Sequence, residues 1–74
     1  MTEKEQFYYD MFAERVSIAM IDGKVPQYKA QSLGVREMAN HMDSVGIGKG
    51  DERVSIFGKI KERAYREGIL RKES

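Results

Sequence analysis

The run DSVGIGKG at residues 43–50 constrains the fold of this chain more than any other stretch. Glycine stands at positions 46, 48 and 50, which excludes a regular helix or strand, so the run is predicted to be a turn or loop. We expect Val45 and Ile47 to anchor this loop in the core.

Before the loop, apolar side chains at helical spacing predict a helix over about residues 35–42. These side chains are Val35, Met38, Ala39 and Met42.

The stretch after this loop predicts a longer basic helix over residues 52–67, with Asp51 as its N-cap and Gly68 as its end. Its predicted apolar face consists of Val54, Phe57, Ile60 and Ala64, with Ile56 beside them. Its basic residues are Arg53, Lys59, Lys61, Arg63 and Arg66. Gly58 inside this helix lowers the stability of the helix by about 1 kcal/mol relative to alanine. We therefore expect Gly58 to mark close packing, against another helix more often than against a DNA backbone. Residues 69–72 predict a short strand.

Residues 2–22 contain neither glycine nor proline and predict an amphipathic helix. Thr2 and Glu5 have the spacing of a capping box, and Gly23 is the expected left-handed stop. One apolar stripe consists of Tyr8, Phe12, Val16, Ala19 and Met20. A second set widens the arc beyond what one neighbouring helix covers: Phe7, Met11, Ile18 and Ile21. The helix is therefore either sandwiched within the core or the face of a homodimer through residues 3–22.

Residues 23–32 are predicted to connect the first two helices, because Gly23 and Pro26 interrupt regular structure. A helix should not cross Pro26, since proline biases the preceding residue toward extended geometry. Residues 28–33, which overlap the end of this connection, fit either a short helical turn or a short strand.

A chain of 74 residues is predicted to form a single domain, 1–74, with one small core. No cysteine is present, and a single histidine cannot build a zinc site, so we expect neither disulfides nor a metal. No apolar run approaches the roughly 20 residues that span a membrane, and no signal peptide is apparent, which predicts a cytoplasmic protein.

The charge of the chain is unevenly distributed. Residues 1–22 have a net charge of −3 from two basic and five acidic residues. Residues 48–74 have +3 from eight basic and five acidic ones.

No pattern of catalytic residues emerges. The run IGKGDE is not a Walker loop, because its lysine is not followed by Ser or Thr. His41 has no Ser, Cys or second His at a suggestive spacing, and no pair of carboxylates lies in an apolar setting. We therefore expect no enzyme activity, no cofactor and a structural role for His41.

The segments VREMANHM and VSIFGKIKERAYREGILRK resemble winged helix-turn-helix DNA-binding domains, as found in LexA-like repressors and small bacterial or phage regulators. In that family the recognition helix ends in a charged pair, a glycine and two apolar residues, and residues 66–70 match this pattern. The resemblance implies a mostly α fold, with a three-helix helix-turn-helix core and a short or truncated β-wing.

The resemblance also implies a small non-enzymatic protein that binds double-stranded DNA, either a transcriptional regulator or a replication or recombination accessory. Helix 52–67 would be the recognition helix, with Arg53, Ser55 and Lys59 facing base edges. The other implied DNA contacts are Arg63 on the same helix and, at phosphates, Lys49, Arg71 and Lys72. The alternative is a protein-interaction module, such as a phage-type inhibitor or adaptor of a host protein, since winged helices serve both purposes.

Overall fold

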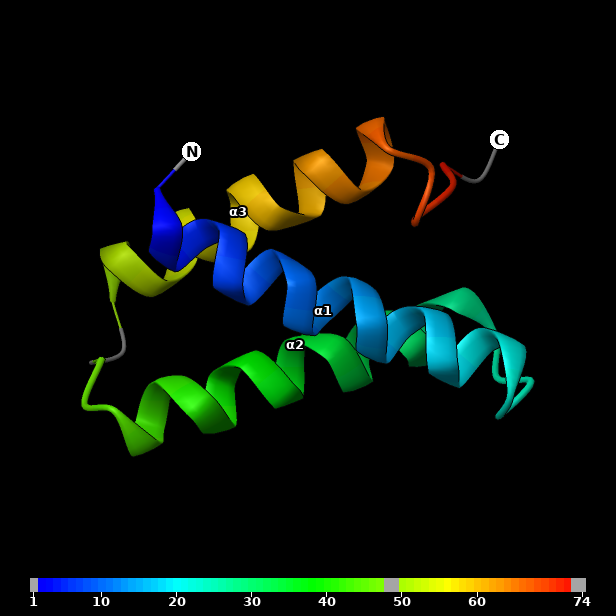
Figure 1. Ribbon diagram of the computed structural model, residues 1–74, viewed down its shortest axis with the longest axis horizontal. Helices are drawn as coiled ribbons and strands as arrows, with labels where there is room; N and C mark the ends of the chain where they lie inside the picture. Colours follow the sequence, from blue (N-terminus) through cyan, green and yellow to red (C-terminus); the bar gives the residue numbers. More distant parts are fainter. Residues whose placement is uncertain (1, 48–49, 73–74) are drawn as a thin grey trace.

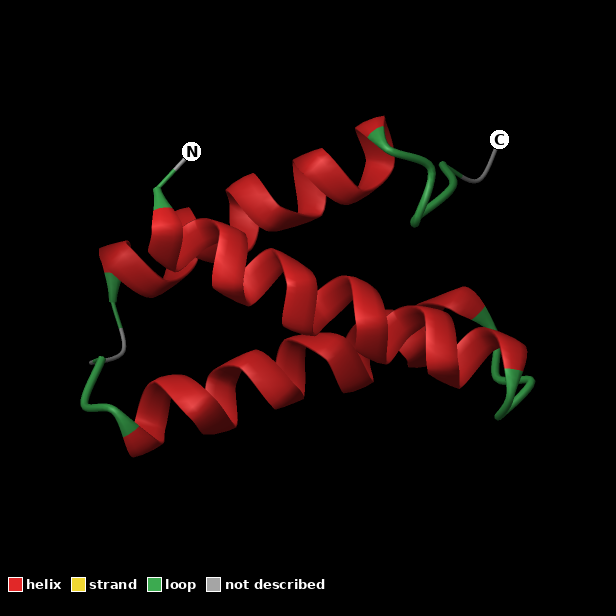
Figure 2. Ribbon diagram, in the orientation of Figure 1, coloured by secondary structure: helices red, strands yellow, loops and turns green. Residues whose placement is uncertain are grey.

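The computed structural model describes residues 2–47 and 50–72, which form three helices (Figure 1). They are α1 (Glu3–Ile21), α2 (Gln27–Ser44) and α3 (Asp51–Arg66). Both α2 and α3 pack on α1 and touch each other only marginally. The described residues contain helices and loops but no strand (Figure 2). The mostly α class is thus confirmed, whereas no β-wing is seen in this part of the chain.

The first helix matches its prediction closely at its N-terminus. The Thr2 hydroxyl oxygen accepts a hydrogen bond from the Glu5 backbone N–H at 3.2 Å, as a capping residue does. The left-handed residue after the helix is Lys24, with φ of 52°, so the prediction of Gly23 as a left-handed stop is wrong. Gly23 instead lies so close to the last turn that an added Cβ would be 2.9 Å from the Ala19 carbonyl oxygen.

The second helix begins at Gln27, eight residues earlier than predicted. Pro26 does not interrupt it but precedes it as the N-cap, a position where the missing N–H of proline removes no helical hydrogen bond. The expectation that no helix crosses Pro26 is confirmed. Gly34 lies buried inside α2, where an added Cβ would be 2.7 Å from Cδ1 of Phe12. The glycine therefore allows α2 to approach α1 closely.

The third helix has the predicted position but a different buried face. Asp51 is its first residue rather than its N-cap, and Gly50 takes the N-cap position without a side-chain hydrogen bond. Its buried residues are Arg53, Ile56, Ile60 and Ala64, whereas Val54 is 69% exposed. The predicted apolar face is thus rotated, because the sequence pattern omitted a buried arginine. Gly68 has φ of 81° and ends the helix region as predicted.

The prediction of a strand at residues 69–72 is wrong. The backbone N–H groups of Ile69 and Leu70 both donate to the carbonyl oxygen of Ala64, at 2.9 and 3.1 Å, which turns the chain back toward the core. Gln27 then holds the backbone of Arg71, accepting from its N–H and donating to its carbonyl oxygen. A strand needs a partner for its ladder, and none lies beside this segment among the described residues.

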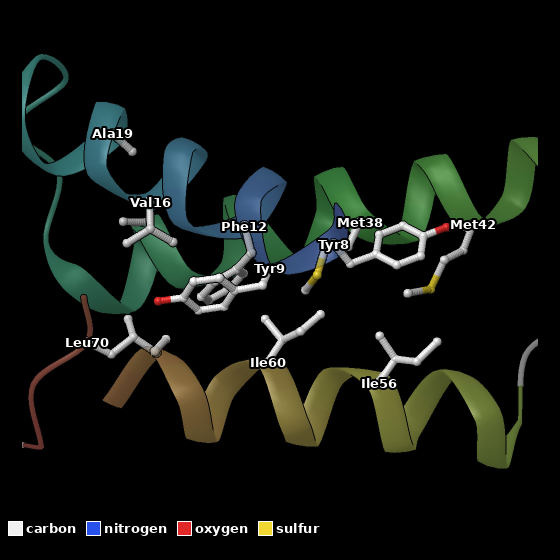
Figure 3. Packing of buried hydrophobic residues seen from close by; sticks show 12 residues of the cluster. Tyr8, Tyr9, Phe12, Val16, Ala19, Met38, Met42, Ile56, Ile60 and Leu70 are labelled. Atoms are coloured by element: carbon white, nitrogen blue, oxygen red, sulfur yellow. The ribbon is translucent and has the colours of Figure 1, made fainter. Parts of the chain in front are cut away.

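The three helices and the C-terminal segment share one hydrophobic core (Figure 3). Ile56 and Ile60 point from α3 toward the side chains of α1, and Leu70 fills the space beyond the end of α3. The largest fully buried side chains are Tyr8, Phe12, Val16, Met38, Met42, Ile60 and Leu70. Of the two expected loop anchors, Ile47 packs against this core and Val45 is exposed, so the expectation for Val45 is wrong.

Candidate nucleic-acid interface

The basic residues of α3 fall on two sides of the helix, and those facing α1 are paired with carboxylates. Lys59 Nζ lies 3.1 Å from Glu5 Oε1, and Lys4 Nζ of α1 lies 2.9 Å from Glu52 Oε1. The hydrogen bond and charge of Glu52 raise the pKa of Lys4 above its ordinary value. These pairs tie α3 to α1 across their exposed edge.

Arg63 belongs to the same side and is held by three neighbours. Its guanidinium carbon lies 4.0 Å from the centroid of the Tyr9 ring, a cation–π geometry. Its Nη1 donates to Gln6 Oε1 at 2.7 Å, and its Nε donates to Glu67. Burial, and secondarily the charge of Glu67, raise the pKa of the Tyr9 phenol. The predicted DNA contact Arg63 thus already has partners within the fold.

Arg53 turns away from solvent altogether and is only 8% exposed. Its Nη2 donates to Asp43 Oδ1 at 2.8 Å and to the carbonyl oxygen of Ile47. Its Nε is buried and has no hydrogen-bond partner among the described residues. The guanidinium therefore connects α3 to the end of α2 and to the loop that follows it. The structure does not bring Arg53 together with Ser55 and Lys59, the residues predicted to act with it.

Ser55 and Lys59 do share a surface hollow, but its chemistry suits phosphate poorly. The hollow lies between α1 and α3 and is lined by Thr2, Lys4, Glu5, Glu52, Ser55, Ile56 and Lys59. Its two carboxylates, Glu5 and Glu52, offset its two lysines, so no net positive charge remains to attract a polyanion.

The other side of α3 is centred on Gly58. An added Cβ there would meet nothing within 4 Å, so the expectation that Gly58 marks close packing is wrong. A second hollow surrounds it, lined by Gly58, Lys61, Glu62, Tyr65, Arg66 and Lys72. We call Lys61, Arg66 and Lys72, with Gly58 and Tyr65 between them, the outer basic face. All three cations are exposed, and none has an ion-pair partner within residues 2–47 and 50–72.

A third hollow adjoins the outer basic face and shares Gly58 and Lys61 with it. It lies between α2 and α3, which diverge over α1, and Phe12 of α1 is among its lining residues. We call this hollow the interhelical groove; its remaining lining residues are Gln31, Val35, Met38, Val54 and Phe57. Most of these side chains are apolar, so the groove differs chemically from the charged face beside it.

The remaining predicted contacts fall at the C-terminal end and in the loop. Lys72 lines the outer basic face, and the Arg71 side chain is exposed while its backbone is held by Gln27. Lys49 lies outside the described residues. The sequence assignment missed Lys61 and Arg66. The spacing of Gly58, Lys61 and Tyr65, in steps of three and four, placed them on one helix face and was the available signal.

No second kind of site stands out in the described part of the chain. His41 is half-buried, with Nδ1 3.0 Å from the Tyr8 hydroxyl oxygen and its ring beside Phe7. Residues 2–47 and 50–72 hold no group of three or more potential metal ligands. None of the described helices is both long and apolar enough to cross a membrane.

Comparisons with protein-family models, curated proteins and solved structures gave no match.

Proposed function

We propose that this protein binds double-stranded DNA through the outer basic face and acts by binding rather than by catalysis. The observation that carries the proposal is the difference between the two sides of α3. Cations on the α1 side have acidic or aromatic partners, whereas Lys61, Arg66 and Lys72 surround an open hollow without an ion pair among the described residues.

Unpaired cations are better phosphate ligands than paired ones. Lys59 must give up Glu5 before it can meet a phosphate, and Arg63 must leave Gln6 and Tyr9. Lys61, Arg66 and Lys72 need only release water and counterions, and counterion release from DNA supplies much of the affinity of such contacts. Glu62 is the one carboxylate among the described residues that line this hollow, so these lining residues together carry a net positive charge.

The shape of the outer basic face supports the same ligand. Gly58 leaves space for close approach of a backbone at the centre of the face, and half-buried Tyr65 offers a hydroxyl group beside it. A helix of 16 residues is about 24 Å long. The major groove of DNA, about 12 Å wide, admits one such helix, so α3 can lie in it with its outer side toward the bases and Arg66 and Lys72 toward phosphates.

On this proposal the predicted contacts divide by role. Arg53 and Arg63 stabilise the fold, whereas Lys72 meets DNA together with the newly assigned Lys61 and Arg66. Lys49 and Arg71 stay predicted phosphate contacts. As a bacterial or phage protein, which the sequence resemblance implies, this chain would act on DNA in the cytoplasm as a transcriptional regulator or a replication or recombination accessory.

The test is the salt dependence of binding to a random-sequence duplex, followed by fluorescence anisotropy. We expect the variant Lys61→Ala/Arg66→Ala/Lys72→Ala to bind more weakly than the wild type. Its plot of log affinity against log salt should be less steep, by about one unit for each phosphate that the variant no longer neutralises. The control is Lys4→Ala/Lys59→Ala, which removes two paired cations, one fewer than the outer variant removes. It should bind almost as the wild type does.

Wild-type protein that shows no salt-dependent binding to DNA would overturn the proposal. A control variant that loses as much affinity as the outer variant would move the site to the hollow between α1 and α3. Circular dichroism spectra of all variants should match, because an exposed unpaired charge contributes less than about 0.5 kcal/mol to stability and an exposed ion pair less than about 1 kcal/mol.

A second candidate function is recognition of a host protein, and the interhelical groove favours it. Val54 is exposed at the groove, beside Val35, Met38 and Phe57, in an arrangement that suits the apolar face of a partner helix. Failure of the wild type to bind duplex or heparin in a salt-dependent way would favour this function over DNA binding.

A further inference from the structure

The carboxylate of Glu62 lies in the hollow of the outer basic face, among cations that we assign to DNA. The side chain is exposed, and it lines the hollow together with Lys61, Arg66 and Lys72. Within residues 2–47 and 50–72 it has no ion pair. Phosphates repel a carboxylate, so Glu62 weakens DNA binding unless it meets a hydrogen-bond donor. Its role in the proposed complex therefore depends on which donor it meets.

Glu62 points directly away from the core. Ile60 and Ala64, two residues before and after it, are both fully buried. An α-helix turns by about 100° per residue, so Glu62 lies about 160° around the helix from each of them. Gly58 lies in the same way between the buried residues Ile56 and Ile60, and with Glu62 it forms the outermost ridge of α3. Because Gly58 has no side chain, a base edge can come close to Glu62.

Lys61 and Arg66 flank this ridge on opposite sides. Lys61 is one residue before Glu62 and thus about 100° to one side of it, whereas Arg66 is four residues after it and about 40° to the other side. Phosphate contacts on the flanks of a helix position it in the groove, and the ridge between them then faces base edges. In this orientation Glu62 meets a base rather than a phosphate.

We propose that Glu62 binds cytosine in the major groove and is a specificity-determining residue, an inference that rests on the proposed binding of double-stranded DNA. The donors in the major groove are the amino groups N4 of cytosine and N6 of adenine. Guanine and thymine present acceptors there, which repel a carboxylate. Adenine N6 lies beside N7, an acceptor of the same base, whereas cytosine presents no acceptor in the groove. Cytosine is therefore the favoured base.

An ion pair along the helix is the alternative role for Glu62. Glu62 and Arg66 have the i, i+4 spacing at which opposite charges pair on a helix surface. The described residues contain no such pair between them. Arg66 is thus available to a phosphate and Glu62 to a base.

Selection from a duplex library with a randomised central segment tests the proposal. The wild type should enrich sites that carry cytosine at one position. Glu62→Gln should enrich adenine there instead, because the amide of glutamine binds N6 and N7 of adenine together. A purely structural carboxylate would give no such switch. The matched control Glu52→Gln makes the same change on the α1 side of α3, where Glu52 pairs with Lys4, and should keep the wild-type preference.

Affinities for single duplexes measure the size of the effect. Replacing the enriched C·G pair by T·A should weaken wild-type binding about tenfold. Glu62→Ala should bind both duplexes equally, and random duplex at least as tightly as the wild type does, because a repulsive charge is gone.

Salt-dependent binding of the wild type without enrichment of cytosine would overturn this inference and leave the proposed function standing. A cytosine preference that persists in Glu62→Ala would have the same consequence. A wild type that binds no duplex would overturn both.

Discussion

The two sides of α3 carry similar numbers of basic residues but use them differently. On the core and α1 side, Arg53, Lys59 and Arg63 are tied to Asp43, Glu5 and Tyr9. On the outer side, Lys61 and Arg66 surround Gly58 with no ion pair among the described residues. Cations on one helix therefore stabilise the fold on one side and stay unpaired on the other, where we propose that they bind a polyanion. Net charge alone does not distinguish the two roles.

The glycines within α2 and α3 show the same contrast between a packed side and an open side. Gly34 faces the core and touches Phe12, whereas Gly58 faces outward into open space. Glycine within a helix lowers helix stability, so we expect another contribution to compensate for it. At position 34 this contribution is the close approach of two helices. At position 58 no packing contact compensates for the glycine, which agrees with the ligand surface proposed for this side of α3.

The largest expected effect comes from removing the buried cation. We expect Arg53→Ala to lower the free energy of unfolding by about 2–3 kcal/mol, because two hydrogen bonds from a charged donor disappear and the Ile47 carbonyl oxygen is left without this donor. Urea denaturation measures this change. DNA affinity at a temperature where the variant is folded should stay near the wild-type value. A stable variant with reduced DNA affinity would show that the core-facing side of α3 also contributes to DNA binding.

A smaller effect is expected at the packed glycine. Gly34→Ala should destabilise by about 1–2 kcal/mol, since overpacking in a core costs about 1–3 kcal/mol and better helix propensity offsets part of it. The Phe12 ring is 1% exposed and enclosed by the core, so it cannot move aside freely. The measurement is the urea midpoint at unchanged slope.

The matched control for that substitution is the open glycine. Gly58→Ala should stabilise by up to about 1 kcal/mol, because the new methyl group meets no neighbour and the unfolded chain loses freedom. Stability changes of opposite sign at the two positions would show that Gly34 is packed and that Gly58 is open. Destabilisation at both positions would show that the outer side of α3 is covered in the folded protein.

Much of the fold could be predicted from periodicity and capping. The Thr2 cap, the buried stripe of α1 and the position of α3 all follow from local patterns. The start of α2 could not, because Pro26 and Gly34 interrupt helices in general, and only the contact with Phe12 shows why this helix tolerates Gly34. Ile69 and Leu70 have strand propensity, but the hydrogen bonds to Ala64 and the burial of Leu70 decide their conformation.

The candidate site was less predictable than the fold. The sequence places basic residues on the right helix, but which of them are free depends on partners far away along the chain. Glu5 is 54 residues from Lys59, and Gln6 is 57 residues from Arg63. Arg53 was missed as a core residue because arginine does not count toward an apolar stripe. Only the folded arrangement shows that Asp43 and Ile47 offset its burial.

The most direct test of the two-sided account of α3 is a backbone amide NMR titration of the wild type with a random-sequence duplex. We predict that the largest shift changes fall at Gly58, Lys61, Tyr65, Arg66 and Lys72, and that they weaken as salt is raised. Shift changes concentrated at Thr2, Ser55 and Lys59 would place the ligand between α1 and α3 and contradict the account. The absence of any change at excess duplex would contradict DNA binding itself.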